Sequence, residues 1–188
     1  MSGIVLAAGT SSRFGSTKQL APAGGKPLAQ HAIDALKEAG DFGEIVVVTG
    51  HDADAVEAAL RLPPTGRFVR NAAYREGQSA SLATAIHALD DSSEAAVVLM
   101  ADQPGVGSEV IRRMVARYRE THKQIVRAAY RDGPGPALLS REVYAEAGHL
   151  SGDVGARVLM ASHPDWVEDV QVDADQPTDI DRPGDLTP

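Results

Sequence analysis

The sequence feature that most constrains the fold is a pair of short, uninterrupted apolar runs, Ile45–Val48 and Val97–Met100. A strand with one face in water alternates apolar and polar residues, whereas a strand buried on both faces is apolar throughout. Burial of both faces is typical of a mostly parallel sheet that helices cover on each side. The two runs therefore predict a three-layer α/β/α sandwich around a mostly parallel sheet.

Segments with strand and helix patterns alternate along the rest of the chain. We expect strands at Gly3–Leu6, Glu44–Thr49, Arg67–Arg70, Ala95–Met100, Ile125–Ala129 and Val167–Val172. Helical spacing lies between them, over Leu28–Ala39, Val56–Leu60, Leu82–Leu89 and Val110–Tyr118. Proline and glycine at 63–66 and 132–136 indicate loops. Because 188 residues with 43% hydrophobic content suffice for one core but hardly for two, we expect a single domain over residues 1–188.

Charge and composition exclude several classes of protein. A formal net charge of −8 argues against a general nucleic-acid or membrane-surface binder, since such proteins need a basic surface. The absence of cysteine excludes disulfides and thiolate metal sites. The start MSGIVLAAG lacks the charged and long apolar regions of a signal peptide, and no apolar run is long enough to span a bilayer. We therefore expect a cytoplasmic protein.

The segment Leu6–Lys18, which follows the first expected strand, is rich in groups that bind phosphate. Gly9 and Gly15 allow a ligand to approach the backbone, three consecutive hydroxyl residues add donors, and Arg13 and Lys18 add positive charge. The glycine spacing fits neither the Walker loop nor the dinucleotide fingerprint. The composition favours a phosphate site over a flexible surface turn.

The run Leu6-Ala7-Ala8-Gly9-x-Ser11-x-Arg13-Phe14-Gly15-x-x-Lys18, followed by Gly25-Lys26-Pro27-Leu28, resembles a known signature. It is typical of the MobA-like NTP transferase superfamily, whose members have one Rossmann-like domain, and is most similar to the molybdenum-cofactor cytidylyltransferases. The resemblance implies that this loop binds a nucleoside triphosphate. The nucleotide-binding residues implied here are Leu6, Ala7, Ala8, Gly9, Thr10, Ser11, Ser12, Arg13, Gly15 and Lys18. Phe14 departs from the pattern, in which methionine is usual.

Asp102 lies two residues past the end of the expected strand Ala95–Met100, at the edge of the sheet where ligands bind. From the residues alone, it is either a ligand of a hard cation or the N-cap of a following helix. The stretch Ala101–Pro104 resembles the family's metal-binding motif, which implies that Asp102 contacts both nucleotide and Mg²⁺. With Arg13 and Lys18, it would complete the catalytic set.

The acidic segment Asp179–Leu186 resembles the Asp-x-Asp-x-Pro-x-Asp-Leu segment that closes the active site in the same family. The resemblance implies that Asp179 meets the metal opposite Asp102, with Asp181 outside the metal's direct contacts. Asp173 and Asp175 form a competing register of the same pattern. Without the resemblance, all four carboxylates would be interpreted as a solvated acidic tail.

Two further segments extend the resemblance. In Asn71–Leu82, the family pattern implies nucleotide contacts by Asn71, Gly77 and Ser81, although Ser79 or Ser81 could simply cap a helix. In Leu150–Arg157, it implies acceptor contacts by Ser151, Asp153 and Arg157, where a plain cap and a surface arginine would explain the residues equally well. None of the six histidines has metal-site spacing, and none is assigned to catalysis.

The resemblance implies a Mg²⁺-dependent enzyme that transfers CMP from CTP to a phosphorylated acceptor, with molybdopterin as the acceptor and a molybdoenzyme as a candidate partner. Ala8 and Gly105 stand where guanylyltransferases of the group have glycine and phenylalanine, which favours CTP. Pro134-Gly135-Pro136 replaces the usual Gly-His-Pro and leaves the acceptor open. Two alternatives remain: an NAD(P)H-dependent oxidoreductase of the nicotine-blue type, and a non-catalytic carrier of the molybdenum cofactor.

Overall fold

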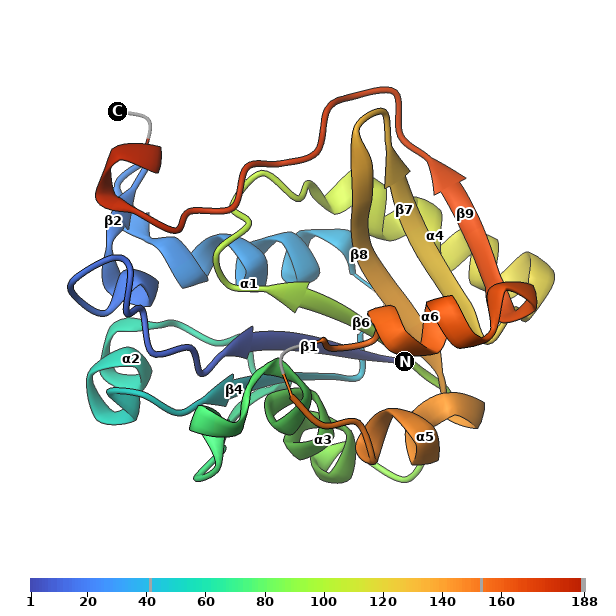
Figure 1. The fold of residues 1–188 in the computed structure, drawn as a ribbon, viewed down its shortest axis with the longest axis horizontal. Coiled ribbons are helices and arrows are strands. Elements are labelled where there is room, and N and C mark those ends of the chain that lie inside the picture. The colour runs from blue at the N-terminus through green and yellow to red at the C-terminus, as the bar shows by residue number, and fades with distance from the viewer. Residues whose placement is uncertain (41, 153, 187–188) are drawn as a thin grey trace.

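The computed structural model describes residues 1–40, 42–152 and 154–186 (Figure 1). Its strands are β1 (Ser2–Ala7), β2 (Pro22–Ala23), β3 (Lys26–Pro27), β4 (Glu44–Thr49), β5 (Gly66–Arg70), β6 (Ala95–Met100), β7 (Ile125–Tyr130), β8 (Gly133–Ser140) and β9 (Val167–Gln171). Its α-helices are α1 (Leu28–Ala39), α2 (Ala53–Ala59), α3 (Gln78–Ala88), α4 (Ser108–Thr121), α5 (Tyr144–Gly148) and α6 (Arg157–Ser162). Short 3-10 helices are η1 (Lys18–Leu20), η2 (Tyr74–Glu76), η3 (Arg141–Val143), η4 (Pro164–Trp166) and η5 (Pro183–Asp185).

Seven strands form the central sheet in the order β5-β4-β1-β6-β8-β7-β9. Strand β1 lies at the middle of a parallel group, with Ile4 opposite Val46 of β4 and Val98 of β6. Only β8 runs antiparallel to both of its neighbours in the sheet as described, β6 and β7. The predicted mostly parallel sheet is confirmed, and it brings the ends of β1 and β6 to the same edge.

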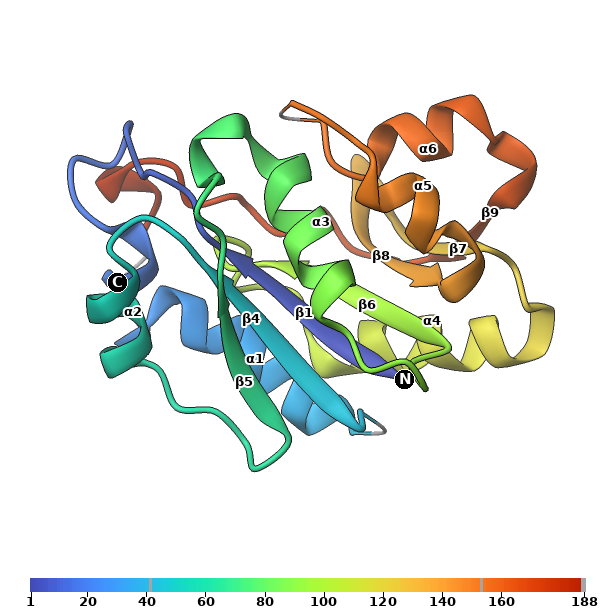
Figure 2. The same ribbon diagram turned by 90° about the horizontal axis from the view of Figure 1, so that it is seen from below.

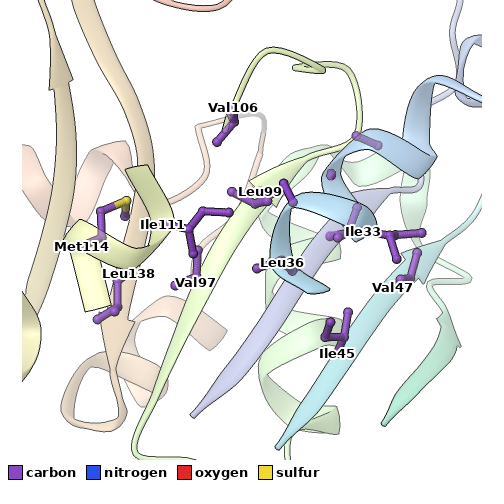
Figure 3. Packing of buried hydrophobic residues seen from close by; sticks show 14 of the residues in the cluster. Ile33, Leu36, Ile45, Val47, Val97, Leu99, Val106, Ile111, Met114 and Leu138 are labelled. Carbon is purple, nitrogen blue, oxygen red and sulfur yellow. The ribbon is translucent and has the colours of Figure 1, made fainter. Parts of the chain in front are cut away.

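Successive side chains of the central strands pack on opposite faces and form two apolar cores. Val5 faces the core beneath α1 and α4, while its neighbour Ile4 faces the core beneath α3 and α5. Figure 2 shows α3 and α5 covering one side of the sheet, with α1 and α4 behind it. Figure 3 shows Ile33 and Leu36 of α1 against Ile45 and Val47 of β4. This packing confirms the three layers. No helix in the described ranges has the length and apolar character needed to cross a membrane.

The loop predicted at 132–136 is wrong for most of its length, because β8 begins at Gly133. Strand β6 pairs with β8 only from Ala137 onward, so the first half of β8 has β7 as its sole paired strand. Proline is tolerated where a strand has a free edge, because no ladder partner misses its N–H there. The register shift between Arg127 and Ala129 accommodates the extra residue. Helices α5 and α6, of five and six residues, were not predicted.

Gly50, directly after β4, is expected to be intolerant of a side chain. A Cβ there would lie 2.6 Å from the Cβ of Tyr74 and 2.9 Å from the Cβ of Ala8. Gly50→Val should therefore lower the free energy of unfolding by about 1–3 kcal/mol through overpacking. Gly107→Ala is the control, since no atom lies within 4 Å of a Cβ at that position. Equal urea-unfolding midpoints for the two variants would contradict this prediction.

Candidate functional site

A cleft of about 570 Å³ opens at the edge of the sheet where β1 and β6 end. Residues from the loop after β1, the segment around η2, the loop after β6, helix α6 and the C-terminal segment line it. Of the predicted nucleotide-binding residues, the cleft brings together Leu6, Ala8, Gly9, Thr10, Ser11, Ser12, Arg13, Lys18, Gly77, Ser81 and Asp102. Ala7 lies in the apolar core instead, and Gly15 lines a smaller neighbouring hollow.

The loop after β1 is shaped by Ser11, which has a φ of 54°, in the left-handed region that disfavours side chains. Its carbonyl accepts hydrogen bonds from the backbone N–H groups of Phe14 (2.9 Å) and Gly15 (3.3 Å). Its hydroxyl accepts one from the backbone N–H of Lys18, at 3.0 Å. The conformation of this one serine therefore turns the chain and fixes the start of η1, from which the Lys18 side chain extends into the cleft.

Gln19 is a functional-site residue that sequence reasoning missed. Its side chain is only 2% exposed, although it lines the cleft. Its Nε2 donates to the carbonyl of Gly9 at 2.9 Å, and its Oε1 accepts from the Ser11 hydroxyl at 3.1 Å. One amide thus bridges two points of the glycine-rich loop. A glutamine between Lys18 and Leu20 carries no local sign of this role, because both contacts depend on the folded loop.

Gln19→Met is expected to lower the free energy of unfolding by about 0.5–1.5 kcal/mol, because the loop loses the hydrogen bond from Gln19 to the Gly9 carbonyl. Gln19→Glu keeps an acceptor for Ser11 but turns an oxygen toward the Gly9 carbonyl, so it should be at least as destabilising as Gln19→Met. Chemical denaturation of both variants tests this. A Gln19→Glu protein as stable as the wild type would show that the bond to Gly9 contributes nothing.

Lys18 is the centre of an ionic cluster. Its Nζ lies 2.7 Å from Asp102 Oδ2 and 3.1 Å from Asp181 Oδ1, and Arg13 Nη1 lies 2.6 Å from Asp181 Oδ2. Burial lowers the pKa of Lys18, but the attraction of Asp102 and the hydrogen bonds to Asp102 and Asp181 outweigh it and raise the pKa above its ordinary value. Lys18 therefore carries its charge throughout the neutral pH range.

The C-terminal segment reaches this cluster by crossing the molecule. In Figure 1 it runs as a long coil from β9 to the loop that follows β1. The backbone N–H of Ile180 donates to the carbonyl of Asp102 at 2.9 Å, and the buried Ile180 side chain packs with Phe14 and Leu28. Two carboxylates on either side of this anchor, Asp179 and Asp181, therefore line the cleft.

The structure places the acidic residues of the sequence patterns in different surroundings. Asp102 is not a helix cap, because α4 begins at Ser108 after Gly107. Asp173 and Asp175 lie near Arg131, at 3.7 and 3.1 Å, and are not among the residues that line the cleft. Asp179 accepts a hydrogen bond from Gln103 Nε2 at 2.7 Å. Of the two acidic patterns, the one that includes Asp179 and Asp181 therefore lines the cleft beside the glycine-rich loop.

The carboxylates suit a hard cation that is held jointly with a ligand. Among the described residues, no group of three His, Cys, Asp or Glu side chains is arranged to hold a metal by itself. Mg²⁺, however, is usually bound by one or two carboxylates together with substrate phosphates and water. Asp102 and Asp179 both line the cleft, on segments joined by the hydrogen bond from Ile180 to Asp102, and they provide oxygen ligands of that kind. The donor set therefore fits a magnesium–triphosphate complex.

Neither Ser79 nor Ser81 caps helix α3. The residue before the helix is Gly77, with a φ of 106°, and no side chain caps it. Ser79 Oγ instead accepts from the N–H of Gly155 at 3.2 Å, and Ser81 Oγ accepts from Asn71 Nδ2 at 3.0 Å. Asn71 is buried and supports Ser81 from behind the cleft wall.

The structure describes two of the three predicted acceptor residues, and one of these two lines the cleft. Arg157, the first residue of α6, lines the cleft, whereas Ser151 is not among its lining residues. Asp153 lies outside the described residues. Tyr74 and Arg75 also line the cleft, with the guanidinium of Arg75 4.8 Å from the centroid of the Tyr74 ring. Sequence reasoning assigned neither of them.

Known proteins resemble this chain over most of its length. The nicotine blue oxidoreductase of Paenarthrobacter nicotinovorans is 31% identical over 191 residues, which cover 96% of this chain and 91% of that protein. The structure of Rv0371c from Mycobacterium tuberculosis H37Rv has a TM-score of 0.85 at 32% identity, covering 98% of this chain and 95% of that one. A structure of Rv0371c in complex with manganese has a TM-score of 0.82 at 30% identity, covering 98% and 94%.

A nucleotidyl transferase from Methanothermobacter thermautotroptrophicus has the same fold, with a TM-score of 0.80 at 25% identity, covering 98% of this chain and 93% of that one. The family model described as a MobA-like NTP transferase domain matches residues 3–167. That range runs from the second residue of β1 to the first residue of β9, and it includes the loop that carries Lys18 and Asp102. The chain therefore belongs to the family of MobA-like NTP transferase domains.

Proposed function

We propose that this protein is a Mg²⁺-dependent cytidylyltransferase that transfers CMP from CTP to a phosphorylated acceptor and releases pyrophosphate. We further propose molybdopterin as the acceptor, a molybdoenzyme as the downstream partner, the cytoplasm as the location, and one domain as the unit of activity. The observation that carries the proposal is the ionic cluster, in which Lys18 contacts Asp102 from the loop after β6, and both Lys18 and Arg13 contact Asp181 from the C-terminal segment.

In the proposed reaction, an oxygen of the acceptor phosphate attacks the α-phosphorus of CTP in line, and the bond to pyrophosphate breaks. The chain's contribution is positioning and charge neutralisation, because phosphoryl chemistry needs little covalent help. Arg13 and Lys18 bind the phosphates, while the backbone from Gly9 to Ser12 offers donors. Mg²⁺, held by Asp102 and Asp179, would neutralise the charge that develops on the phosphate oxygens.

A second candidate is an NAD(P)H-dependent oxidoreductase, for which the glycine-rich loop would bind a dinucleotide pyrophosphate. It is favoured by the 31% identity to the nicotine blue oxidoreductase over 96% of this chain. The loss of the histidine at Pro134-Gly135-Pro136 is consistent with it, because that element distinguishes the molybdenum-cofactor enzymes in the resemblance. The two candidates share the loop but differ in their need for a cation.

The deciding experiment is thermal stabilisation by each of the four nucleoside triphosphates with Mg²⁺, and by NADH and NADPH with a chelator. A ligand present at a hundred times its dissociation constant should add about 2.7 kcal/mol to the free energy of unfolding. Selective stabilisation by CTP, followed by pyrophosphate release with molybdopterin, is the expected result. Stabilisation by NADPH alone would replace the transferase with the reductase, and a protein that binds molybdopterin without turnover would be a carrier.

A further inference from the structure

The anion-binding groups of the glycine-rich loop already have an anion, which is supplied by the chain itself. Asp181 contacts both cations of the loop, Lys18 at 3.1 Å and Arg13 at 2.6 Å, with one carboxylate oxygen each. A phosphate bound between Lys18 and Arg13 would accept hydrogen bonds from both cations, as this carboxylate does. A triphosphate that approaches Arg13 and Lys18 therefore competes with Asp181 for these cations.

The placement of Asp181 is built into the segment around it. The carboxylate of Asp185 accepts hydrogen bonds from the backbone N–H groups of Asp181 (2.9 Å) and Arg182 (2.7 Å). Those same bonds lower the pKa of Asp185, so its carboxylate stays charged at neutral pH and continues to accept them. On the other side, Ile180 is anchored by its backbone bond to Asp102 and by its buried side chain. Asp181 is thus held between two fixed points.

Three carboxylates line the cleft close to the two cations of the loop. Asp102, Asp179 and Asp181 all line the wall that a triphosphate would approach. A free triphosphate would meet these three carboxylates while both loop cations are paired, so electrostatic repulsion opposes its binding. A divalent cation held by Asp102 and Asp179 would change this balance, because it would reduce the negative charge of both the triphosphate and the carboxylates around it.

From this geometry we infer that Asp181 is a specificity-determining residue, an internal counter-ion that makes the site select the cation complex of a triphosphate over the free anion. The inference rests on the proposed function, since it concerns the same triphosphate site. It differs from a role as metal ligand in one measurable respect. A metal ligand supports binding when the cation is present, whereas a counter-ion opposes binding when the cation is absent.

The test is isothermal titration calorimetry, which measures the affinity of the full chain for inorganic tripolyphosphate in EDTA and in Mg²⁺. Wild-type protein should bind tripolyphosphate measurably better in Mg²⁺ than in EDTA. Asp181→Asn should raise the affinity in EDTA about tenfold, because one repelling charge at contact distance is removed and Lys18 and Arg13 are released. The gain from Mg²⁺ should shrink accordingly. Asp173→Asn, an exposed carboxylate near Arg131, is the control and should leave both affinities unchanged.

A second variant separates the inference from effects of the substituted side chain itself. Asp185→Ala removes the acceptor that holds the backbone at Asp181, so it should raise the affinity in EDTA in the same direction without altering Asp181. Unchanged or weaker binding of both variants in EDTA would overturn the inference and leave the proposed function standing. Absence of tripolyphosphate binding by every form, with and without Mg²⁺, would overturn the proposed function and the inference with it.

Discussion

Replacement of Lys18 by methionine is expected to reduce nucleotidyl transfer by a factor on the order of 10²–10³, the usual cost of removing one group that stabilises developing charge. Lys18 forms ion pairs with both Asp102 and Asp181, and its ammonium group would move from these carboxylates to the phosphates. Methionine keeps much of the side-chain volume but carries no charge. Pyrophosphate release from CTP with molybdopterin and Mg²⁺ measures the effect.

The same substitution should also lower the free energy of unfolding by about 1–3 kcal/mol, because Asp102 loses a charged partner in a largely buried position. The transfer rate must therefore be compared at a temperature where both proteins are folded. Lys123→Met is the matched control, since Lys123 donates to the carbonyl of Asp165 outside the cleft. A Lys18→Met protein with the turnover of the Lys123→Met protein would exclude Lys18 from the chemistry.

The strands that could be predicted most accurately from the sequence are those buried on both faces of the sheet. Strands β4 and β6 were predicted with their observed bounds, because burial on both faces makes the central residues of each strand continuously apolar. Strand β8 was missed, because Pro134 and Pro136 lie in the half of the strand that pairs with β7 alone. Local sequence shows that a proline lacks an N–H, but only the assembled sheet shows whether a partner strand needs that N–H.

The candidate site was predictable where its residues are neighbours in sequence. Glycine, hydroxyl and basic residues within Leu6–Lys18 indicate phosphate binding without knowledge of the fold. The contact between Lys18 and Asp181 spans 163 positions of the chain, so it depends on where the C-terminal segment ends its path. The family pattern placed Asp179 opposite Asp102 and Asp181 farther away, whereas the ionic contacts to Lys18 come from Asp102 and Asp181. The metal-ligand role of Asp179 stays a prediction.

Asp102→Asn is expected to separate binding from catalysis. Asparagine leaves the backbone carbonyl of Asp102 free to accept from the N–H of Ile180, so the C-terminal segment should stay in place. It removes one carboxylate charge from Lys18 and from the proposed magnesium site. Transfer of CMP with Mg²⁺ should therefore fall on the order of 10²–10³-fold, since the cation would lose a ligand where charge develops.

The affinity of Asp102→Asn for tripolyphosphate in EDTA, by contrast, should equal or exceed that of the wild type, because Lys18 gains freedom to bind an anion. The two effects have opposite signs, and a general loss of structure cannot produce that combination. Asp175→Asn is the control, because its carboxylate lies near Arg131 and outside the residues that line the cleft. Loss of both turnover and tripolyphosphate affinity would instead show that the Asp102 carboxylate holds the site together, with Lys18 positioned by it for binding.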